Sequence, residues 1–510
     1  MKHIISTLSA IALLTGFTAC ELDYAPENTM VDETVYKTEK TAEAALTGAY
    51  TRLCVFLSGA PNDQNNYTNS SFAFQFAEIG TDNASVHSSS AGYKAMETCE
   101  YTTDQHDGFI KSIYIYGYNA IDYANNIISG VNEFGAYDAT TMKKHIAEAK
   151  FIRAYEYFTL LCLYGDGALT GDDNGLGLVM RLTPYDGYKP ENIQARVSVG
   201  EVYKQIIKDL TDAIPDLPAT EYAPSGRFRV TATGAKALLS RVYLYKGSYT
   251  NNTEELTKAM NYAGEVLTSS SITFNSDYTD HRTNIFPSNM YIDGDYPDPT
   301  NYASELILFQ PSRISTNVFP CGWGMVFSKQ SFSTTQELMN SYHPGDRRGY
   351  GTTNEYLIQT GSTSSYSSLF ASMKYDNTAN FSGAYNDVQY IRLSEIKLNY
   401  AEAMTRVNNN IDSEALKHLN DIRRKPFPDE QKPAAFTASD FTSVEAFLDS
   451  MLVERNRELA WEGHYRWDLI RTGRELRVKG IPDNRKILPI PEYEITISDG
   501  VIKQNSGFAE

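Results

Sequence analysis

The sequence predicts a mostly α-helical protein: a tetratricopeptide-like scaffold of helical hairpins with a large, irregular, loop-rich insertion that contains short strands. Three observations predict this class. Apolar residues recur with helical spacing towards both ends of the chain. Several of the helices come in pairs and carry small residues where they would meet. Between them, residues 270–388 are rich in Pro, Ser, Thr and Tyr and keep no helical period, which is typical of long loops.

Nine helices are expected in chain order, over residues 41–57, 113–131, 142–164, 199–214, 233–245, 254–267, 390–404, 413–424 and 444–472. The helix 199–214 has Ser198 as its expected N-cap and ends at Pro215. The next two helices are joined by a short turn and should form an antiparallel hairpin. Residues 58–108 are rich in Asn, Ser, Thr and Gly, and we expect long loops there.

The composition fits a folded protein with a substantial core. The 510 residues are 42% hydrophobic and 21% charged. The net charge of -18, from 45 basic and 63 acidic residues, argues against a nucleic-acid partner, which would require a basic face. We divide the chain into an N-terminal helical region (20–269), the variable insertion (270–388) and a C-terminal helical region (389–510), preceded by a leader.

The leader, residues 1–19, has the pattern of an export signal. Lys2 precedes an apolar run, and small residues stand directly before Cys20. This arrangement resembles a lipobox, in which Cys20 becomes the acylated first residue and holds the protein to a membrane without spanning it. Glu21 and Asp23 resemble the acidic signal that directs Bacteroidetes lipoproteins to the cell exterior. The alternative is ordinary secretion with a chance cysteine.

Four further cysteines could form disulfides, and their spacing does not choose among the three possible pairings: Cys54, Cys99, Cys162 and Cys321. Cys162 lies on an apolar helical stripe and is expected to be a buried free thiol. The motifs of P-loop, α/β-hydrolase, zinc-protease and dinucleotide-binding enzymes are absent, and no cofactor is expected.

Two acidic turns could supply calcium ligands, although solvated turns are the favoured interpretation of both. One contains Asp293, Asp295 and Asp298, and the other is the turn 172–174. A glycosidase would need two carboxylates about 5–10 Å apart. The 63 acidic residues of the chain neither exclude nor locate such a pair.

Six blocks resemble, in order, the SusD/RagB family of outer-membrane nutrient-binding lipoproteins. They are Ala147–Asp166, with Arg-Ala-Tyr-Glu-Tyr-Phe and Tyr-Gly-Asp; Tyr203–Pro218; Ala235–Leu244; Tyr390–Arg423; Glu454–Arg471; and Leu488–Pro491 with Gln504-Asn505. The fifth block is the most specific. Its dense opposite charges suggest Arg–carboxylate pairs between packed helices, formed by Glu454, Arg455, Arg457, Glu458, Glu462, Arg466, Asp468 and Arg471. Trp461 and Trp467 are expected to pack that scaffold, and acid–base catalysis by Glu458 or Glu462 is disfavoured.

The resemblance implies a non-enzymatic protein that captures oligosaccharide at the cell surface. It also implies delivery of this ligand to a SusC-like TonB-dependent transporter, and an outer-membrane location through the lipid anchor, facing the cell exterior. Two alternatives stay open. One is the same transport role for a peptide or glycopeptide, which the Tyr-rich and Trp-poor loops allow. The other is a surface glycoside hydrolase.

The ligand is expected to bind to loops that combine aromatic faces with polar groups, because a sugar ring stacks on the former and its hydroxyls pair with the latter. Residues 61–101 offer Tyr67, Asp82, Asn83 and Tyr93. Residues 285–325 offer Tyr291, Tyr296, Tyr302, Arg313 and Trp323. Trp323 stands between Gly322 and Gly324, which favours an exposed tip.

Overall fold

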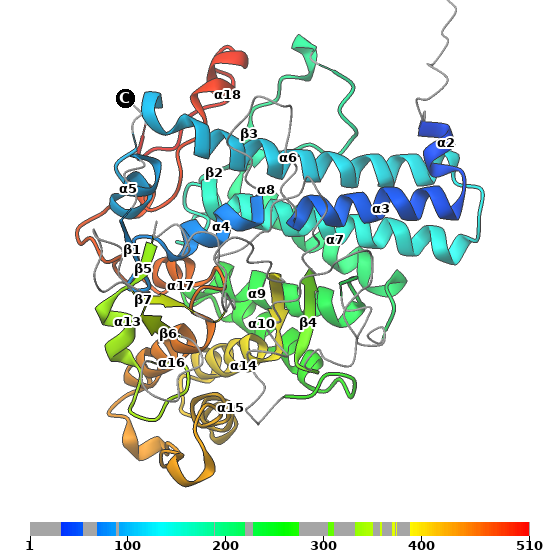
Figure 1. Cartoon of the computed structure of the whole chain (residues 1–510). Helices are drawn as coiled ribbons and strands as arrows, with labels where there is room; N and C mark the ends of the chain where they lie inside the picture. Colours follow the sequence, from blue (N-terminus) through cyan, green and yellow to red (C-terminus); the bar gives the residue numbers. More distant parts are fainter. Residues whose placement is uncertain are drawn as a thin grey trace, which may run out of the picture.

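The computed structural model describes residues 32–54, 69–87, 91–101, 103–187, 189–219, 228–274, 304–310, 332–349, 357–359, 370–372, 374 and 388–508. Helices dominate these ranges, as predicted (Figure 1). Three long N-terminal helices pack against one another in a bundle: α3 (Glu39–Cys54), α6 (Thr103–Phe134) and α7 (Ala139–Tyr164). The short helix α2 (Asp32–Tyr36) packs on α6, where Gly130 lets the ring of Tyr36 approach the helix backbone closely.

From α7 onwards, each long helix packs against the next along the chain. The series runs through α7, α8 (Val199–Ala213), α9 (Ala232–Ser248), α10 (Thr253–Leu267), α14 (Leu393–Asn408) and α15 (Ser413–Arg424). Helix α8 begins with the expected cap, because Ser198 and Glu201 each accept a hydrogen bond from the other's backbone N–H. The packing of successive helices confirms the predicted hairpin of α9 and α10 and the helical-hairpin scaffold.

The structure corrects three predicted boundaries. The helix expected over 444–472 is two helices, α16 (Val444–Leu459) and α17 (Tyr465–Arg471). Between them Trp461 and Gly463 have positive φ values of 70° and 83°, which end one helix and redirect the chain. The segment starting at 390 begins as the strand β8 (Val388–Arg392) before α14. Residues 58–108 contain α4 (Asn69–Glu78) and α5 (Ala91–Thr98), where only loops were predicted.

The described strands form four two-stranded antiparallel pairs. They are β1 (Ala84–Val86) with β5 (Phe332–Thr334), β2 (Leu176–Val179) with β3 (Arg196–Ser198), β4 (Leu306–Gln310) with β8, and β6 (Leu357–Gln359) with β7 (Phe370–Ser372). Four of these strands, together with α13 (Gln336–Ser341), belong to residues 270–388, which confirms the insertion with short strands. The β4–β8 pair connects the insertion to the C-terminal region.

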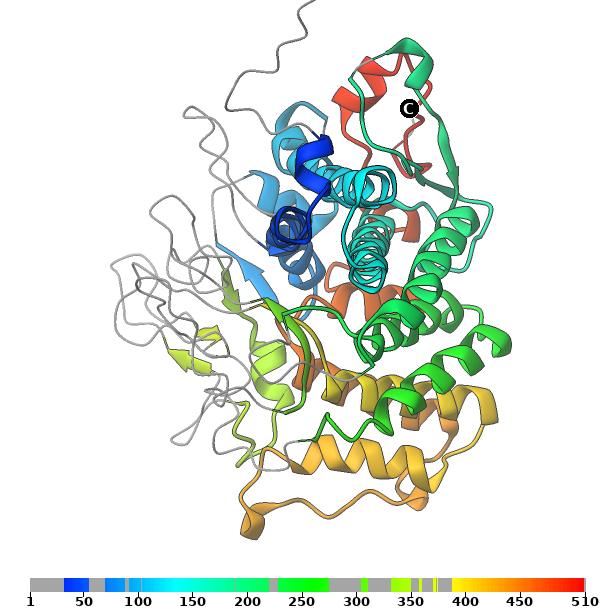
Figure 2. The same ribbon diagram turned by 90° about the vertical axis from the view of Figure 1, so that its right-hand side faces the viewer.

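One large core extends from the N-terminal helices to the C-terminal segment, and a smaller core lies between α14, α15 and α16. Trp461 and Trp467 belong to the large core, as predicted for scaffold residues. Cys162 is a buried free thiol, also as predicted. Among the described helices, none is long and apolar enough to cross a membrane. Figure 2 shows α18 (Glu492–Ile497) on the opposite side of the α3–α6–α7 bundle from strands β5–β7.

Candidate functional site

Strand β1 lies inside the first predicted ligand-binding region (61–101), and it pairs with β5, which follows the second region (285–325). Ala84 pairs with Thr334 and Val86 with Phe332. Thr335 extends this contact, because its backbone N–H donates to the carbonyl oxygen of Asn83 at 3.3 Å. We call this junction the β1–β5 seam. Part of region 61–101 and the chain that follows region 285–325 therefore lie side by side, although they are far apart in sequence.

Asn83 is a structural residue of the seam, which corrects its assignment as a ligand contact. Its side chain is fully buried, and its Nδ2 donates to Glu78 Oε2 at 2.6 Å and to Asn456 Oδ1 at 2.8 Å. The Nδ2 of Asn456 donates back to Asn83 Oδ1 at 2.9 Å. This paired amide contact connects the seam to helix α16, and it leaves Asn83 no surface to offer a ligand.

Glu78 lies beneath the seam and receives hydrogen bonds from two parts of the chain, one of them Asn83. Its Oε1 accepts from the backbone N–H groups of Gly463 and His464, at 2.9 and 3.3 Å, in the turn between α16 and α17. Burial raises the pKa of Glu78 to about 7, and the hydrogen bonds from Asn83 and these N–H groups only partly oppose that effect. The folded protein therefore binds a proton at this carboxyl more tightly than the unfolded chain does.

Arg466 fixes the backbone on which the seam is built. Its guanidinium donates to the carbonyl oxygens of Phe76 at 2.8 Å, Met96 at 2.7 Å and Lys486 at 3.0 Å, and also to that of Ile79. The expectation of a carboxylate partner is wrong for this arginine, because its charge is instead shared among carbonyl dipoles of three segments. A buried guanidinium with five donors suits such a position.

The remaining charges of the C-terminal block form a buried ion-pair network, as predicted. Arg392 donates to Glu458 Oε1 and Glu462 Oε2, both at 2.7 Å. Arg348 and Lys374 reach the same network from the insertion and bind Glu458 and Glu462, respectively. Both glutamates are at most 3% exposed in their side chains. Their burial in ion pairs agrees with the scaffold role expected for this block.

The other predicted ligand residues have different outcomes. Tyr93 is buried on α5 in the large core, so its assignment as a surface contact is wrong for this conformation. Asp82 is half-buried at the seam, and its carbonyl oxygen accepts a hydrogen bond from the hydroxyl of Thr335. The remaining predicted sites lie outside the described residues: Cys20, Tyr67, Tyr291, Tyr296, Tyr302, Arg313 and Trp323, with the thiol of Cys321 and the acidic turn at 293–298.

The acidic turn at 172–174 is a solvated turn with internal partners. Asp173 pairs with Lys246 at 3.1 Å, and Asp172 Oδ1 accepts from the backbone N–H of Asn174 at 3.0 Å. Within the described part of the chain, no three His, Cys, Asp or Glu side chains are grouped so that they could hold a metal ion.

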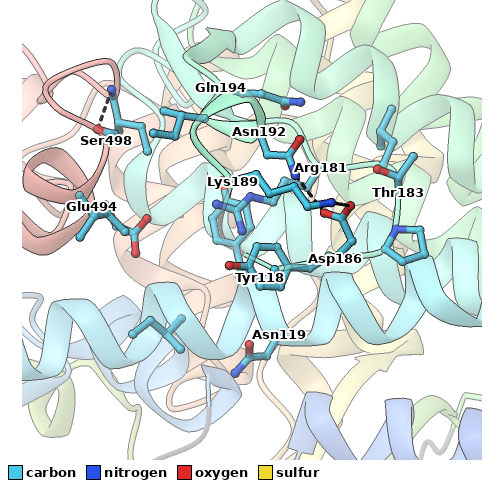
Figure 3. Close-up of a pocket in the computed structure, with 18 of the residues that line it drawn as sticks. Tyr118, Asn119, Arg181, Thr183, Asp186, Lys189, Asn192, Gln194, Glu494 and Ser498 are labelled. Atoms are coloured by element: carbon cyan, nitrogen blue, oxygen red, sulfur yellow. Dashed lines mark hydrogen bonds and ion pairs between the residues drawn. The ribbon is translucent and has the colours of Figure 1, made fainter. Parts of the chain in front are cut away.

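A cleft of about 520 Å³ lies on another face of the protein, and the sequence did not predict it. Helix α6 forms one wall, the segments 181–187 and 189–194 form a second wall, and α18 with the residues after it forms the third (Figure 3). The labelled residues that line it are Tyr118, Asn119, Arg181, Thr183, Asp186, Lys189, Asn192, Gln194, Glu494 and Ser498. None of the predicted ligand residues lines this cleft. The sequence feature that could have indicated this cleft is Pro184-Tyr185-Asp186-Gly187, a turn with an exposed aromatic residue in a polar stretch.

Two family models match the chain in succession. One, described as "Starch-binding associating with outer membrane", matches residues 22–244, and the model of the SusD family matches residues 239–488. The fold and these matches define a carbohydrate-binding class of protein that is associated with the outer membrane. The chain belongs to the SusD family.

Curated relatives and solved structures agree with this assignment. A SusD-like protein of Bacteroides ovatus is 28% identical over 289 residues, which are 55% of this chain and about half (47%) of that protein. SusD-like protein P38 of Formosa agariphila is 24% identical over 96% of both chains. A SusD superfamily structure from Bacteroides vulgatus has a TM-score of 0.74 at 21% identity, covering 93% of this chain and 100% of the other. A laminarin-binding SusD-like protein has a TM-score of 0.66 at 20% identity, with the same coverage. These structures are similar to this chain in fold.

Proposed function

We propose that this protein captures oligosaccharide at the cell surface and delivers it to a SusC-like TonB-dependent transporter. The observation that carries the proposal is the succession of two SusD-type matches over residues 22–488, one of them described as starch-binding and outer-membrane associated. The laminarin-binding protein of the same fold supports a glycan as the ligand. The protein would hold the ligand without changing it chemically.

The proposed anchor is the lipid on Cys20. A short linker of about ten residues would then separate the lipid from α2, the first described helix. Cys20→Ala should move the protein from the membrane fraction to the soluble fraction. Retention of the variant in the membrane, in amounts equal to the wild type, would contradict this anchor. Isolation of the wild-type protein from detergent-solubilised outer membranes should recover the transporter with it.

The proposed ligand surface is built on the β1–β5 seam, from the loops that adjoin it. The contacts below the seam support this role, because Arg466 and the Glu78–Asn83–Asn456 hydrogen bonds hold its backbone in place. A fixed base lowers the entropy lost when loops bind a ligand. Trp323 is the proposed stacking platform, with Tyr67, Tyr291, Tyr296, Tyr302, Arg313 and Asp82 as further candidates.

The test is a calorimetric titration of Trp323→Ala with a saccharide that the wild-type protein binds. A lost aromatic platform should weaken binding by about 1–3 kcal/mol. Tyr123→Ala is a suitable control, since Tyr123 is an exposed aromatic residue on α6 and lies outside both loop regions. Circular dichroism should show the same helix content in all three proteins. Wild-type affinity in Trp323→Ala would place the platform on another residue.

A further inference from the structure

We propose that the cleft between α6 and α18 is a second saccharide site, which takes a short neutral oligosaccharide independently of the surface at the β1–β5 seam. The ligand class rests on the proposed function, whereas the location does not. The volume of about 520 Å³ lies within the range of small-molecule sites, about 300–1,000 Å³. Four observations support the proposal: a fixed wall, an exposed aromatic ring, an available arginine, and a lining whose charges cancel.

The wall formed by residues 181–187 is held from below by buried polar groups. Asn125 Nδ2 donates to the carbonyl oxygens of Arg181 and Thr183, at 3.1 and 3.2 Å. The hydroxyl of Tyr157 contacts both the N–H and the carbonyl oxygen of Arg181 at 2.7 Å. The backbone N–H of Tyr185 donates to Asp122 Oδ1 at 2.7 Å. An exposed segment with this many internal contacts is pre-organised for a ligand.

Buried arginines connect this wall and the C-terminal wall to the scaffold. Arg153 donates to Asn125 Oδ1 at 2.8 Å and is itself bound by both carboxylate oxygens of Asp209, at 2.8 and 2.7 Å. Arg196 donates to the carbonyl oxygens of Tyr164 and Lys503, both at 3.0 Å. The second arginine therefore joins α7 to the segment that follows α18. The cleft is thus bounded by fixed elements on its three sides.

An aromatic ring and a guanidinium face the solvent in the cleft. The side chain of Tyr185 is 54% exposed, although the segment beneath it is tightly held. The Arg181 guanidinium lies 5.9 Å from the centroid of that ring and 5.3 Å from that of Tyr118. Within the described residues, the guanidinium makes no hydrogen bond or ion pair. Stacking of a sugar's CH face on Tyr185, with hydroxyls accepting from Arg181, fits this geometry.

The charges of the lining favour a neutral ligand. Two acidic residues, Asp186 and Glu494, face two basic residues, Arg181 and Lys189. Asp186 is already bound by Lys189 at 2.5 Å and by Asn192 at 2.9 Å. Burial raises the pKa of Tyr118 well above its usual value, so its hydroxyl stays neutral. Asn119 and Gln194 add exposed amides, which can both donate to and accept from sugar hydroxyls.

The test uses the full mature protein in detergent and a panel of hexasaccharides: laminarihexaose, maltohexaose, cellohexaose and xylohexaose. Hydrogen–deuterium exchange locates the bound sugar, and calorimetry measures its affinity. At least one neutral hexasaccharide should slow exchange in the segments 181–187 and 189–194. Tyr185→Ala and Arg181→Ala should each weaken binding at this site about tenfold. Tyr493→Ala is the matched control, an exposed tyrosine of α18 that does not line the cleft. It should bind as the wild type does.

The outcomes separate this proposal from the proposed function. The second site would be overturned if bound sugar slowed hydrogen exchange only in the loops around the seam and if Tyr185→Ala and Arg181→Ala kept wild-type affinity. The proposal of glycan capture would still hold in that case. Protection of the cleft that persists in Trp323→Ala would support two independent sites. Tighter binding of an oligogalacturonide than of every neutral hexasaccharide would overturn the neutral assignment. Absence of binding by the wild-type protein to every saccharide would overturn both proposals.

Discussion

Removal of the Arg466 guanidinium should destabilise the protein more than any change in an exposed ion pair. In Arg466→Ala, four buried carbonyl groups lose their donor, those of Phe76, Ile79, Met96 and Lys486. Each buried polar group without a partner costs about 1–3 kcal/mol. Water entering the vacated space would satisfy part of this demand. We therefore expect a loss of about 3–5 kcal/mol in the free energy of unfolding, which is less than the sum of the four separate costs.

The assay is urea unfolding followed by circular dichroism, with Arg474→Ala as the control. Arg474 belongs to the same part of the chain, but its side chain is 37% exposed and pairs with Glu445 and Asp449 at the surface. Its loss should cost at most about 1 kcal/mol. Equal midpoints for wild type and Arg466→Ala would refute the reasoning. If ligand binding were lost at the same time, Arg466 would be a binding residue instead.

Three further predictions concern the seam and the core. The pKa of Glu78, about 7 in the folded state against 4.5 ordinarily, means that the folded protein binds this proton more tightly. The corresponding stabilisation, about 3 kcal/mol, is fully present below pH 4.5 and is lost as the pH rises through 7. In Glu78→Gln, the free energy of unfolding should therefore change less with pH between these two values. The same pH dependence in this variant as in the wild type would contradict the prediction. Asn456→Ala should lower the unfolding midpoint, because Asn83 would lose its paired amide contact, and a wild-type midpoint would show that this contact adds nothing to stability. Cys162 should resist a thiol reagent until the protein unfolds, since burial raises its pKa and excludes the reagent; rapid labelling of the native protein would count against a closed core.

Helical periodicity predicted most of the scaffold, because buried faces of long helices repeat every three to four residues. The helix α15 has the predicted bounds, and α8 begins at the predicted cap. Short helices were missed because a period of three to four residues is visible only over several turns. Helices α4 and α5 have only 10 and 8 residues, too few for the period to stand out among their polar neighbours. The break at Trp461 gave no signal, because its left-handed conformation is imposed by tertiary packing and not by local preference.

The candidate ligand residues were harder to predict than the scaffold. Asn83 and Tyr93 have the composition of a sugar-binding loop, but their burial depends on contacts with distant residues such as Asn456. The cleft at α6 was also beyond sequence reasoning, because its walls come from three parts of the chain that meet only in the fold. In contrast, the C-terminal charge block was correctly assigned to the scaffold, since dense opposite charges at helical spacing favour ion pairs.

The central claim is that this protein holds an oligosaccharide at the cell surface without cleaving it. The most direct measurement is equilibrium dialysis of the wild-type protein against the hexasaccharide panel, followed by chromatography of the recovered sugar. The account predicts that at least one hexasaccharide is retained by the protein and recovered at its original length, with no new reducing ends. Failure to retain any hexasaccharide, or recovery of shorter fragments, would contradict it.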